Sequence, residues 1–377
     1  MERVKLKDIC RLINGRAYKQ EELLDSGKYP VLRVGNFFSD KDFYYSDLEL
    51  EEDKYCDNGD LLFAWSASFG PKIWDGEKVI YHYHIWKMEL TDRVNKEFLF
   101  YYLFHLSERI KSEGHGGIMI HTTKAEMEER EFNLPTHEEQ IAISEILNKV
   151  KSVIDKRKEE LSALDDLIKA RFVEMFGDAV DNPMGWEKRQ LQEIVTDDCT
   201  ISYGIVQTGD DQEEGVPVFR PVDIVNRVPK LDELKKTTEE ISNKYKRTVL
   251  KGREMLITVR ANIADTYIIG EEFKGCNVGR GIVPIRTKED IMVLEFLKYL
   301  MDSKHLNDKI KSKAKGITLI QLNMEDLREV ELIVPPLEQQ KVFVEFANQV
   351  NKSKFAVQKT LEQTQTLFDS LMQKYFG

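Results

Sequence analysis

The sequence predicts an α+β fold of two similar mixed, β-rich domains, each followed by a long helix, with the two helices pairing as an antiparallel coiled coil. Three observations predict it. The 377-residue chain repeats itself at an offset of 200 residues. Each repeat ends in about forty residues with heptad periodicity. The stretches before those helices are short apolar or alternating runs separated by Gly, Asp and Asn turns, which is typical of strands.

The repeat is clearest at the end of each copy, where residues 132–177 align with 332–377 without a gap. Upstream, "RIKSEGHGGIMI" from Arg109 matches "KIKSKAKGITLI" from Lys309, and "GDLLFAWSAS" matches "REMLITVRAN". The chain is therefore one unit written twice. Ten positions in the gapless part are identical: Pro135/Pro335, Glu138/Glu338, Gln140/Gln340, Glu145/Glu345, Asn148/Asn348, Val150/Val350, Leu161/Leu361, Leu167/Leu367, Phe176/Phe376 and Gly177/Gly377.

The helix of the first copy is expected over 136–176, and that of the second over 336–377. Thr136 and Glu139 form a T-x-x-E capping box directly after Pro135, which marks the helix start. The apolar heptad positions predict the seam along which the helices pair and the region where partners dock. These positions are Ile143, Leu147, Val150, Ile154, Leu161, Leu164 and Ile168 in the first helix, and Phe343, Val350, Val357, Leu361, Phe368 and Leu371 in the second. The alternative is two ordinary amphipathic helices, each packed on its own core.

The domain boundaries follow from these helices. Residues 1–135 form the first domain, and 191–335 the second. Each is expected to contain a helix late in its sequence, "KEFLFYYLFHLSERIKS" and "VLEFLKYLMDSKHLNDKIKS". The stretch 177–190 has Asn-Pro, two glycines and no periodicity, so it is expected to be a linker.

Composition excludes several classes of protein. No apolar run approaches the eighteen or so residues that a membrane span requires, and the N-terminus lacks a signal core. Cys10, Cys56, Cys199 and Cys276 are far apart and contain no C-x-x-C pair, which argues against a zinc site and favours the reducing cytoplasm. The net charge of -11 argues mildly against a nucleic-acid partner.

With both repeats and the linker in view, the chain resembles the specificity subunit of type I restriction-modification systems over nearly its whole length. The resemblance lies in the paired "P-x-x-E-x-Q" and "P-x-x-E-Q-Q" helix starts, the helix ends "EMFG" and "QKYFG", and the link "GDAVDNPMGW". It implies a non-catalytic prokaryotic, cytoplasmic subunit with two target-recognition domains, each reading one half of a gapped duplex DNA site. The helices would set the spacing and dock two modification subunits. S-adenosylmethionine, ATP and Mg would be held by the modification and restriction subunits, and this chain would bind no cofactor.

The acidic charge departs from this resemblance but is local. Residues 40–60 contain nine acids and two lysines, and the rest of 1–135 has 16 acids and 17 bases. We expect 40–60 to be a solvated loop away from DNA. Lysines before a glycine turn neutralise phosphates without reading sequence, although a merely solvated helix end is the alternative. The expected phosphate contacts are Lys309, Lys311, Lys313 and Lys315, with Arg109, Lys111 and His115 at the matching place.

Base reading requires polar side chains on loops that enter a groove. In the first domain the candidates are Arg33, Trp65, Ser66, Ser68, Lys72, His121, Thr122 and Lys124. In the second they are Arg220, Arg260, Asn262, Gln321 and Asn323. The alternative for Arg33 and Arg220 is a structural role, since each lies in an apparent strand.

Two rival functions remain. A coiled-coil scaffold that binds proteins and no DNA is favoured by the acidic charge, and salt-dependent duplex binding distinguishes it. A self-sufficient methyltransferase would need a glycine-rich cofactor turn, which the sequence lacks. His82 and His84 share one strand face without a third ligand nearby, so packing or DNA contact is expected before metal binding.

Overall fold

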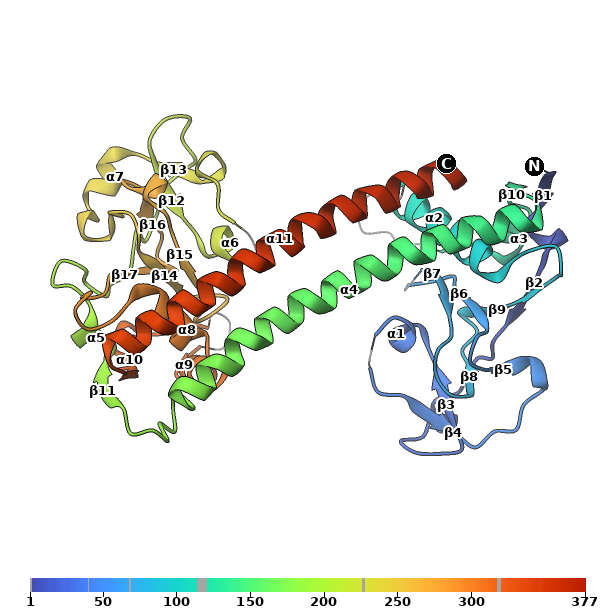
Figure 1. Ribbon diagram of the computed structural model, residues 1–377, viewed down its shortest axis with the longest axis horizontal. Coiled ribbons are helices and arrows are strands. Elements are labelled where there is room, and N and C mark those ends of the chain that lie inside the picture. Colours follow the sequence, from blue (N-terminus) through green and yellow to red (C-terminus); the bar gives the residue numbers. More distant parts are fainter. Residues whose placement is uncertain (1, 40, 68, 114–120, 226–227, 317–319) are drawn as a thin grey trace. The chain divides into compact units, whose positions relative to one another are not determined.

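The computed structural model describes residues 2–39, 41–67, 69–113, 121–225, 228–316 and 320–377 (Figure 1). The chain divides into two compact units. Unit 1 comprises Met1–Lys158 and Lys359–Gly377, and unit 2 comprises Glu159–Gln358. Each unit therefore contains one domain and a segment of both long helices, α4 (His137–Phe176) and α11 (Leu337–Phe376).

Unit 1 contains two four-stranded sheets, with strand orders β2-β9-β6-β7 and β4-β3-β8-β5, and a separate ribbon of β1 with β10. Its strands are β1 (Glu2–Lys5), β2 (Cys10–Asn14), β3 (Tyr29–Leu32), β4 (Tyr44–Ser46), β5 (Tyr55–Cys56), β6 (Leu61–Ala64), β7 (Gly70–Ile73), β8 (Val79–Tyr81), β9 (Ile85–Leu90) and β10 (Glu131–Leu134). Its shorter helices are α1 (Val34–Phe37), α2 (Lys96–Glu113) and α3 (Lys124–Glu128), with 3-10 turns η1 (Leu6–Asp8), η2 (Gln20–Glu22) and η3 (Glu52–Lys54).

Unit 2 contains two three-stranded sheets, β15-β14-β17 and β13-β12-β16, and a ribbon of β11 with β18. Its strands are β11 (Glu187–Gln190), β12 (Val216–Phe219), β13 (Lys235–Thr237), β14 (Met255–Thr258), β15 (Thr266–Ile268), β16 (Asn277–Val278), β17 (Ile282–Ile285) and β18 (Glu331–Val334). Its helices are α5 (Leu191–Ile194), α6 (Pro221–Ile224), α7 (Glu239–Asn243), α8 (Leu294–Asp302), α9 (Lys304–Ser312) and α10 (Met324–Arg328), with 3-10 turns η4 (Leu231–Glu233), η5 (Lys246–Thr248) and η6 (Glu271–Phe273).

The two units share one topology, which confirms the predicted α+β fold and its duplication. In both, the first strand of the domain pairs antiparallel with the last one: β1 with β10 in unit 1, and β11 with β18 in unit 2. In both, one strand pair is parallel: β3 with β8 in unit 1, and β12 with β16 in unit 2. The first strand of each parallel pair also has an antiparallel neighbour, β4 beside β3 and β13 beside β12. The ribbons bring the two ends of each domain together.

Three local expectations are wrong. Residues 187–190, expected in the linker, form β11, because they pair with β18. The helix expected from Val293 is broken at Ser303 into α8 and α9. The acidic stretch 40–60 is not a loop throughout, because it contains β4 and β5, whose buried residues include Ser46, Tyr55 and Cys56. The acids between these strands, Asp47, Glu49, Glu51 and Glu52, are exposed, as expected.

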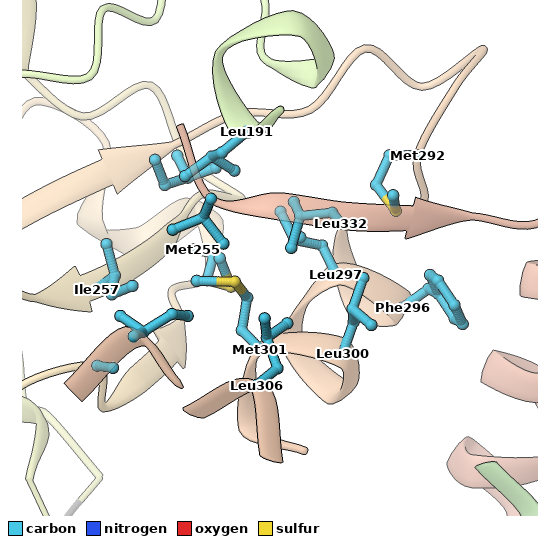
Figure 2. Packing of buried hydrophobic residues seen from close by; sticks show 14 of the residues in the cluster. Leu191, Met255, Ile257, Met292, Phe296, Leu297, Leu300, Met301, Leu306 and Leu332 are labelled. Carbon is cyan, nitrogen blue, oxygen red and sulfur yellow. The ribbon is translucent and has the colours of Figure 1, made fainter. Parts of the chain in front are cut away.

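Each unit has its own apolar core. In unit 2, side chains from α5, β14, α8 and β18 meet in a single cluster, with Leu191, Met255, Leu297 and Leu332 all fully buried (Figure 2). In unit 1, the equivalent cluster is built around α2 and the β2-β9-β6-β7 sheet. Because burial of apolar surface dominates folding stability, each unit, with its segments of the long helices, has a core of its own.

Within each unit the two helix segments pack against one another and against the domain. In unit 2, Asp165 of α4 pairs with Lys354 of α11, and further along α4 the ring of Phe172 lies 5.4 Å from that of Phe343. Since the partner position moves backwards as α4 advances, the segments are antiparallel. In unit 1, Ile154 of α4 shares a cluster with Phe368 of α11.

The thirteen heptad positions expected to form the seam are buried or half-buried. They therefore pack helix against helix and helix against domain, as expected of a seam. Five of them, Val150, Leu161, Leu164, Leu361 and Leu371, are only half-buried, and their part in docking stays a prediction. Leu167 and Leu367, which occupy equivalent positions in the two repeats, are 47% and 50% exposed.

The repeated motif P-x-x-E-x-Q has a structural explanation in its glutamine. In unit 2, Gln340 is fully buried, its amide donates to the carbonyls of Pro335 and Ile291, and its Oε1 accepts from Val293 N at 2.9 Å. Gln140 makes the same three contacts in unit 1. One side chain thus fixes the start of each long helix to the loop before the domain's helix.

We expect Gln340→Ala to lower the free energy of unfolding by about 2–4 kcal/mol, because it leaves three buried backbone polar groups without hydrogen-bond partners. Urea denaturation of the purified chain measures the change. Gln339→Ala is the matched control, since Gln339 is the exposed neighbour on the same helical turn. Equal midpoints for the two variants would contradict this account of the motif.

Candidate nucleic-acid interface

In both units, two stretches that are distant in sequence meet at the end of the sheet. In unit 1, Ser66 and His121 form an antiparallel bridge, and Thr122 N donates to Trp65 O at 3.3 Å. In unit 2, Arg260 and Gln321 form the same bridge, and Leu322 N donates to Val259 O at 2.9 Å. Candidates that the sequence placed on two separate loops therefore lie side by side in each unit.

A third segment joins them, the turn 82–84 in unit 1 and 279–281 in unit 2. Trp65 N donates to His84 O at 3.1 Å, and Val259 N donates to Gly281 O at 2.8 Å. We call the three segments together the recognition surface of each unit: 65–67, 82–84 and 121–123 in unit 1, and 259–263, 279–281 and 320–323 in unit 2. Of the third segment, the sequence analysis singled out only His82 and His84. The sequence around this turn does not show that it lies beside the other two segments in the fold.

The loops of the recognition surfaces are held in a strained conformation at the same place. Ala67 and Ala261 have φ of 60° and 61°, in the left-handed region that residues with a Cβ rarely adopt. Such strain persists where the surrounding structure imposes it, and it is concentrated at functional loops. Its recurrence in both repeats indicates that the loop geometry is a property of the fold.

The recognition surface of unit 1 is aromatic. Trp65 lies edge-on to His84 at 4.8 Å between ring centroids, and Tyr83 lies 3.9 Å from His84 and 4.5 Å from His82. Burial lowers the pKa of His82 to about 4, with a smaller contribution from His84 and Arg33, and burial also lowers the pKa of His84. Both imidazoles are therefore neutral at pH 7.

The recognition surface of unit 2 is cationic. Nε of Arg260 is buried without a hydrogen-bond partner in the described part of the chain. The guanidinium carbon of Arg280 lies 5.9 Å from the centroid of the Tyr203 ring, and the Tyr203 hydroxyl accepts from Gln321. Buried donors are almost always satisfied. Arg260 is one of six described residues with such an unpartnered buried atom, and its donor lies at the recognition surface.

The basic turn of unit 2 adjoins this surface. Lys315 and Gln321 exchange two backbone hydrogen bonds of 3.0 Å each. Lys309 and Lys311 are exposed near the end of α9, and Lys313 caps that helix. No carboxylate of the described residues lies within 4.0 Å of any of the four ammonium groups, which leaves their charge available.

The matching turn of unit 1 is less basic. Lys111 is paired with Glu108 at 2.8 Å, and exposed Arg109 lies on the same helix, α2. His115 and the base-reading candidate Ser68 lie outside the described residues. A phosphate contact shared by the two repeats therefore has better support in unit 2.

Other candidates have structural roles. The guanidinium of Arg220 makes two 3.0 Å hydrogen bonds to the fully buried Asp223, which also caps the backbone of Arg220. The equivalent cap in unit 1 is Asn36, which has no charge to hold Arg33, and Arg33 lies over the ring of Tyr44 at 5.1 Å. Arg220 is therefore structural, as the sequence allowed, and Arg33 remains a candidate.

The buried hydroxyls are the weakest candidates. Ser66 and Thr122 are 7% and 4% exposed, so neither can reach a groove without rearrangement. Lys72 lies over Trp74 and within 3.4 Å of Asp75, on β7 beside α2 and away from the bridge to His121. Lys124 faces Glu128 at 3.6 Å on α3.

The remaining polar candidates are exposed on their loops. His121, Asn262 and Asn323 are exposed, and Asn323 also precedes α10 as its N-terminal cap residue. Their backbone is fixed by the bridges described above or by the turn at 258–265, while their side chains face solvent. They are the positions that meet a partner without any change in the fold.

Nothing in the described ranges assembles a metal centre, since no group of three His, Cys, Asp or Glu side chains is placed to bind one ion. All four cysteines are free and buried, and burial raises the pKa of Cys10 to about 12 and that of Cys276 to about 11. Thiols of this kind are unreactive. Over the same ranges, no helix is long and apolar enough to cross a bilayer.

Comparison with known proteins agrees with this geometry. The family described as "Type I restriction modification DNA specificity domain" matches residues 1–164 and 183–364. The EcoBI specificity subunit of Escherichia coli is 22% identical over 403 residues, covering 99% of this chain and 85% of the relative. The putative MjaX specificity subunit of Methanocaldococcus jannaschii is 25% identical over 369 residues, covering 89% and 83%.

Two solved structures share the fold over the whole chain. The type I restriction-modification S subunit from M. genitalium superimposes with a TM-score of 0.59 at 14% identity, covering 100% of this chain and 96% of the other. A chain from the structure titled as the basis of complex assembly and conformational transition of the type I R-M system gives 0.60 at 20%, covering 100% and 97%.

The fold defines a duplicated specificity protein that presents the same three backbone segments in each repeat. The chain belongs to the type I restriction-modification DNA specificity family, and it is the specificity subunit of such a system.

Proposed function

We propose that each unit reads one half of a gapped, bipartite duplex DNA site, and that this chain places partner modification subunits on that site without catalysing a reaction itself. The observation that carries the proposal is the shared backbone of the two recognition surfaces. The same bridges and turns hold Ser66 and Arg260, Tyr83 and Arg280, and His121 and Gln321 at equivalent places. One scaffold with different side chains is what two different half-sites require.

The long helices are proposed to set the spacing of the half-sites and to dock two modification subunits. Leu167 and Leu367 are exposed at equivalent positions of the two repeats, so a contact made by one copy of the partner can be repeated by a second copy. The partner subunits would supply adenine methylation with S-adenosylmethionine, and a further subunit would supply ATP- and Mg-dependent cleavage. We propose no cofactor site in this chain.

Co-expression with its modification subunit, followed by genome-wide mapping of methylated adenines, tests the function. The expected result is one split motif with two specified halves. Methylation without a sequence motif would favour the rival in which the chain is a protein-binding scaffold. Salt-dependent binding of duplex DNA by the purified complex distinguishes the same two functions independently.

The basic turn allows a quantitative test. Replacing Lys309, Lys311, Lys313 and Lys315 with Ala should weaken binding to all duplexes alike, because phosphate contacts carry no sequence information. The slope of log K against log salt should become shallower by about 0.9 for each phosphate that the variant no longer neutralises. The measurement is duplex binding by the assembled complex across a salt series.

A charge-matched control replaces four exposed lysines of unit 2 that lie outside the long helices. The control set is Lys244, Lys246, Lys251 and Lys274. The two variants have the same net charge, so a difference in slope reports contact with phosphates and not the overall field. Identical slopes would mean that the turn lysines only solvate the end of a helix.

A further inference from the structure

One turn of the recognition surface carries different side chains in the two units. It lies between β8 and β9 in unit 1 and between β16 and β17 in unit 2. In unit 1 it is His82, Tyr83 and His84, and in unit 2 it is Gly279, Arg280 and Gly281. Tyr83 N donates to Arg16 O at 3.0 Å, and Arg280 N donates to Ile205 O at 2.8 Å. The backbone is thus held alike in both, and Arg280 occupies the place of a tyrosine.

Arg280 is free to bind a ligand. No carboxylate in the described part of the chain lies within 4.0 Å of its guanidinium, in contrast to Arg220, whose guanidinium is locked by the buried Asp223. Arg280 is half-buried and lies over the Tyr203 ring. A cation–π contact of this length restrains where the guanidinium lies, and the guanidinium is itself a planar fork that can make two parallel hydrogen bonds.

Arg260 stands directly beside this turn. A Cβ on Gly281 would lie 3.5 Å from the Cβ of Arg260 and 2.6 Å from Cγ of Pro221, so only glycine lets the turn lie so close. Arg260 also brings its orphaned buried Nε to the same place. Two arginines without carboxylate partners in the described ranges therefore converge on one edge of unit 2.

The surroundings separate base reading from phosphate binding. The four lysines of the neighbouring turn already supply flexible point charges, which suit phosphates. The planar fork of a guanidinium suits the O6 and N7 acceptors of guanine, which is the commonest specific contact in the major groove. At the equivalent position of unit 1, Tyr83 lies among neutral rings and offers no such fork.

We infer that Arg280 is a specificity-determining residue that reads a guanine in the half-site of unit 2, with Arg260 beside it, and that the half-site of unit 1 is read without an arginine at this position. This inference rests on the proposed function and adds a base identity to it. Arg280 is the side chain that contacts the base, and Tyr203 is the residue that positions it.

The test uses the complete complex with its modification subunit and duplexes that carry each base pair at each specified position. Arg280→Lys retains the charge but removes the fork. Discrimination at one G·C pair should fall by about 5- to 150-fold, which is the range for one bidentate contact. Arg280→Gln should shift the preference at that pair towards A·T, because glutamine pairs with adenine N6 and N7. The half-site of unit 1 should be unchanged in both variants.

Arg253→Lys is the control, since Arg253 is an exposed arginine of unit 2 that pairs with Glu295 at 3.1 Å. It should leave every position of the motif unchanged. A melting temperature equal to that of the wild-type complex shows that each variant is folded and assembled.

The two proposals fail differently. A wild-type complex that methylates without a split motif refutes the proposed function. A split motif whose discrimination survives Arg280→Lys and Arg280→Gln in full refutes the guanine contact alone. A lower affinity for every duplex alike, with discrimination intact, would make Arg280 a phosphate contact and would also overturn the inference.

Discussion

Exchanging residues 190–330 for the matching domain of a relative should replace one half of the methylated motif and leave the other half intact. Most of the core of unit 2 lies in the exchanged segment, including α5, β14 and α8, and it packs on β18 and the long helices, which stay in place. The exchange points fall at the end of the β11–β18 ribbon, where Gln190 is paired with Glu331. Because the ribbon brings both ends of the domain together, the new domain enters without stretching the chain. Distant sites contribute additively to binding, so each half should be read separately.

The reciprocal exchange is the control. Residues 6–130 lie inside the β1–β10 ribbon, where Lys5 is paired with Glu131. Their replacement should change the other half of the motif. Methylated adenines mapped across the genome give both results. If either exchange altered both halves in a complex that still assembled, the two units would not read independently.

The second large effect concerns the gap between the half-sites. Inserting one heptad into each long helix, between Lys158 and Glu159 and between Gln358 and Lys359, should lengthen the gap by up to about three base pairs. Those are the points at which the units divide, so neither core is cut. Seven residues add about 10 Å of helix, and one base pair occupies about 3.4 Å. A whole heptad keeps the apolar stripe in register.

The outcome is measured in the same way, by the motif that the complex methylates. Both specified halves should persist while the unread interval grows, and rotation of one domain around the duplex can reduce the increase. A heptad inserted into α4 alone is the control, because it mismatches the lengths of the paired segments and should lower the melting temperature. An unchanged gap in a folded, active double insertion would show that the helices dock partners but do not set the spacing.

The sequence predicted the features that local signals specify. The duplication, the long helices and the capping box at Thr136 and Glu139 were all predicted, and the box is present, with Thr136 N 2.9 Å from Glu139 Oε2 and Glu139 N 3.3 Å from Thr136 Oγ1. Aligning the repeats also matched the loop of Arg260 to that of Ser66, and the segment of Gln321 to that of His121. The structure places the members of each match at equivalent ends of the same bridge. Heptads, caps and repeats are visible because each depends on neighbours in the sequence.

The features that were missed depend on distant neighbours. Nothing near Arg280 in the sequence indicates that Tyr203, 77 positions earlier, lies under its guanidinium. Lys72 was grouped with Trp65 because the two are close in sequence. In the structure Lys72 lies on β7, which packs beside α2, and its ammonium faces Asp75. β11 was expected to be part of a linker, because its four residues form a strand only by pairing with β18, about 140 positions later. Reading surfaces are built from such tertiary pairings, so candidate residues were predicted less well than the fold.

The division of the chain into units has a consequence for biosynthesis. Residues 359–377 belong to unit 1, where Phe368 and Met372 share the core with Ile154, and Phe376 lies 5.3 Å from Phe98. A ribosome makes those residues after all of unit 2. The apolar surface of the first domain that packs on residues 359–377 therefore stays exposed while some two hundred residues are translated. Contacts of such long sequence separation also form slowly. Unit 2, whose residues are continuous, can close first, so the order of folding is expected to run opposite to the order of synthesis.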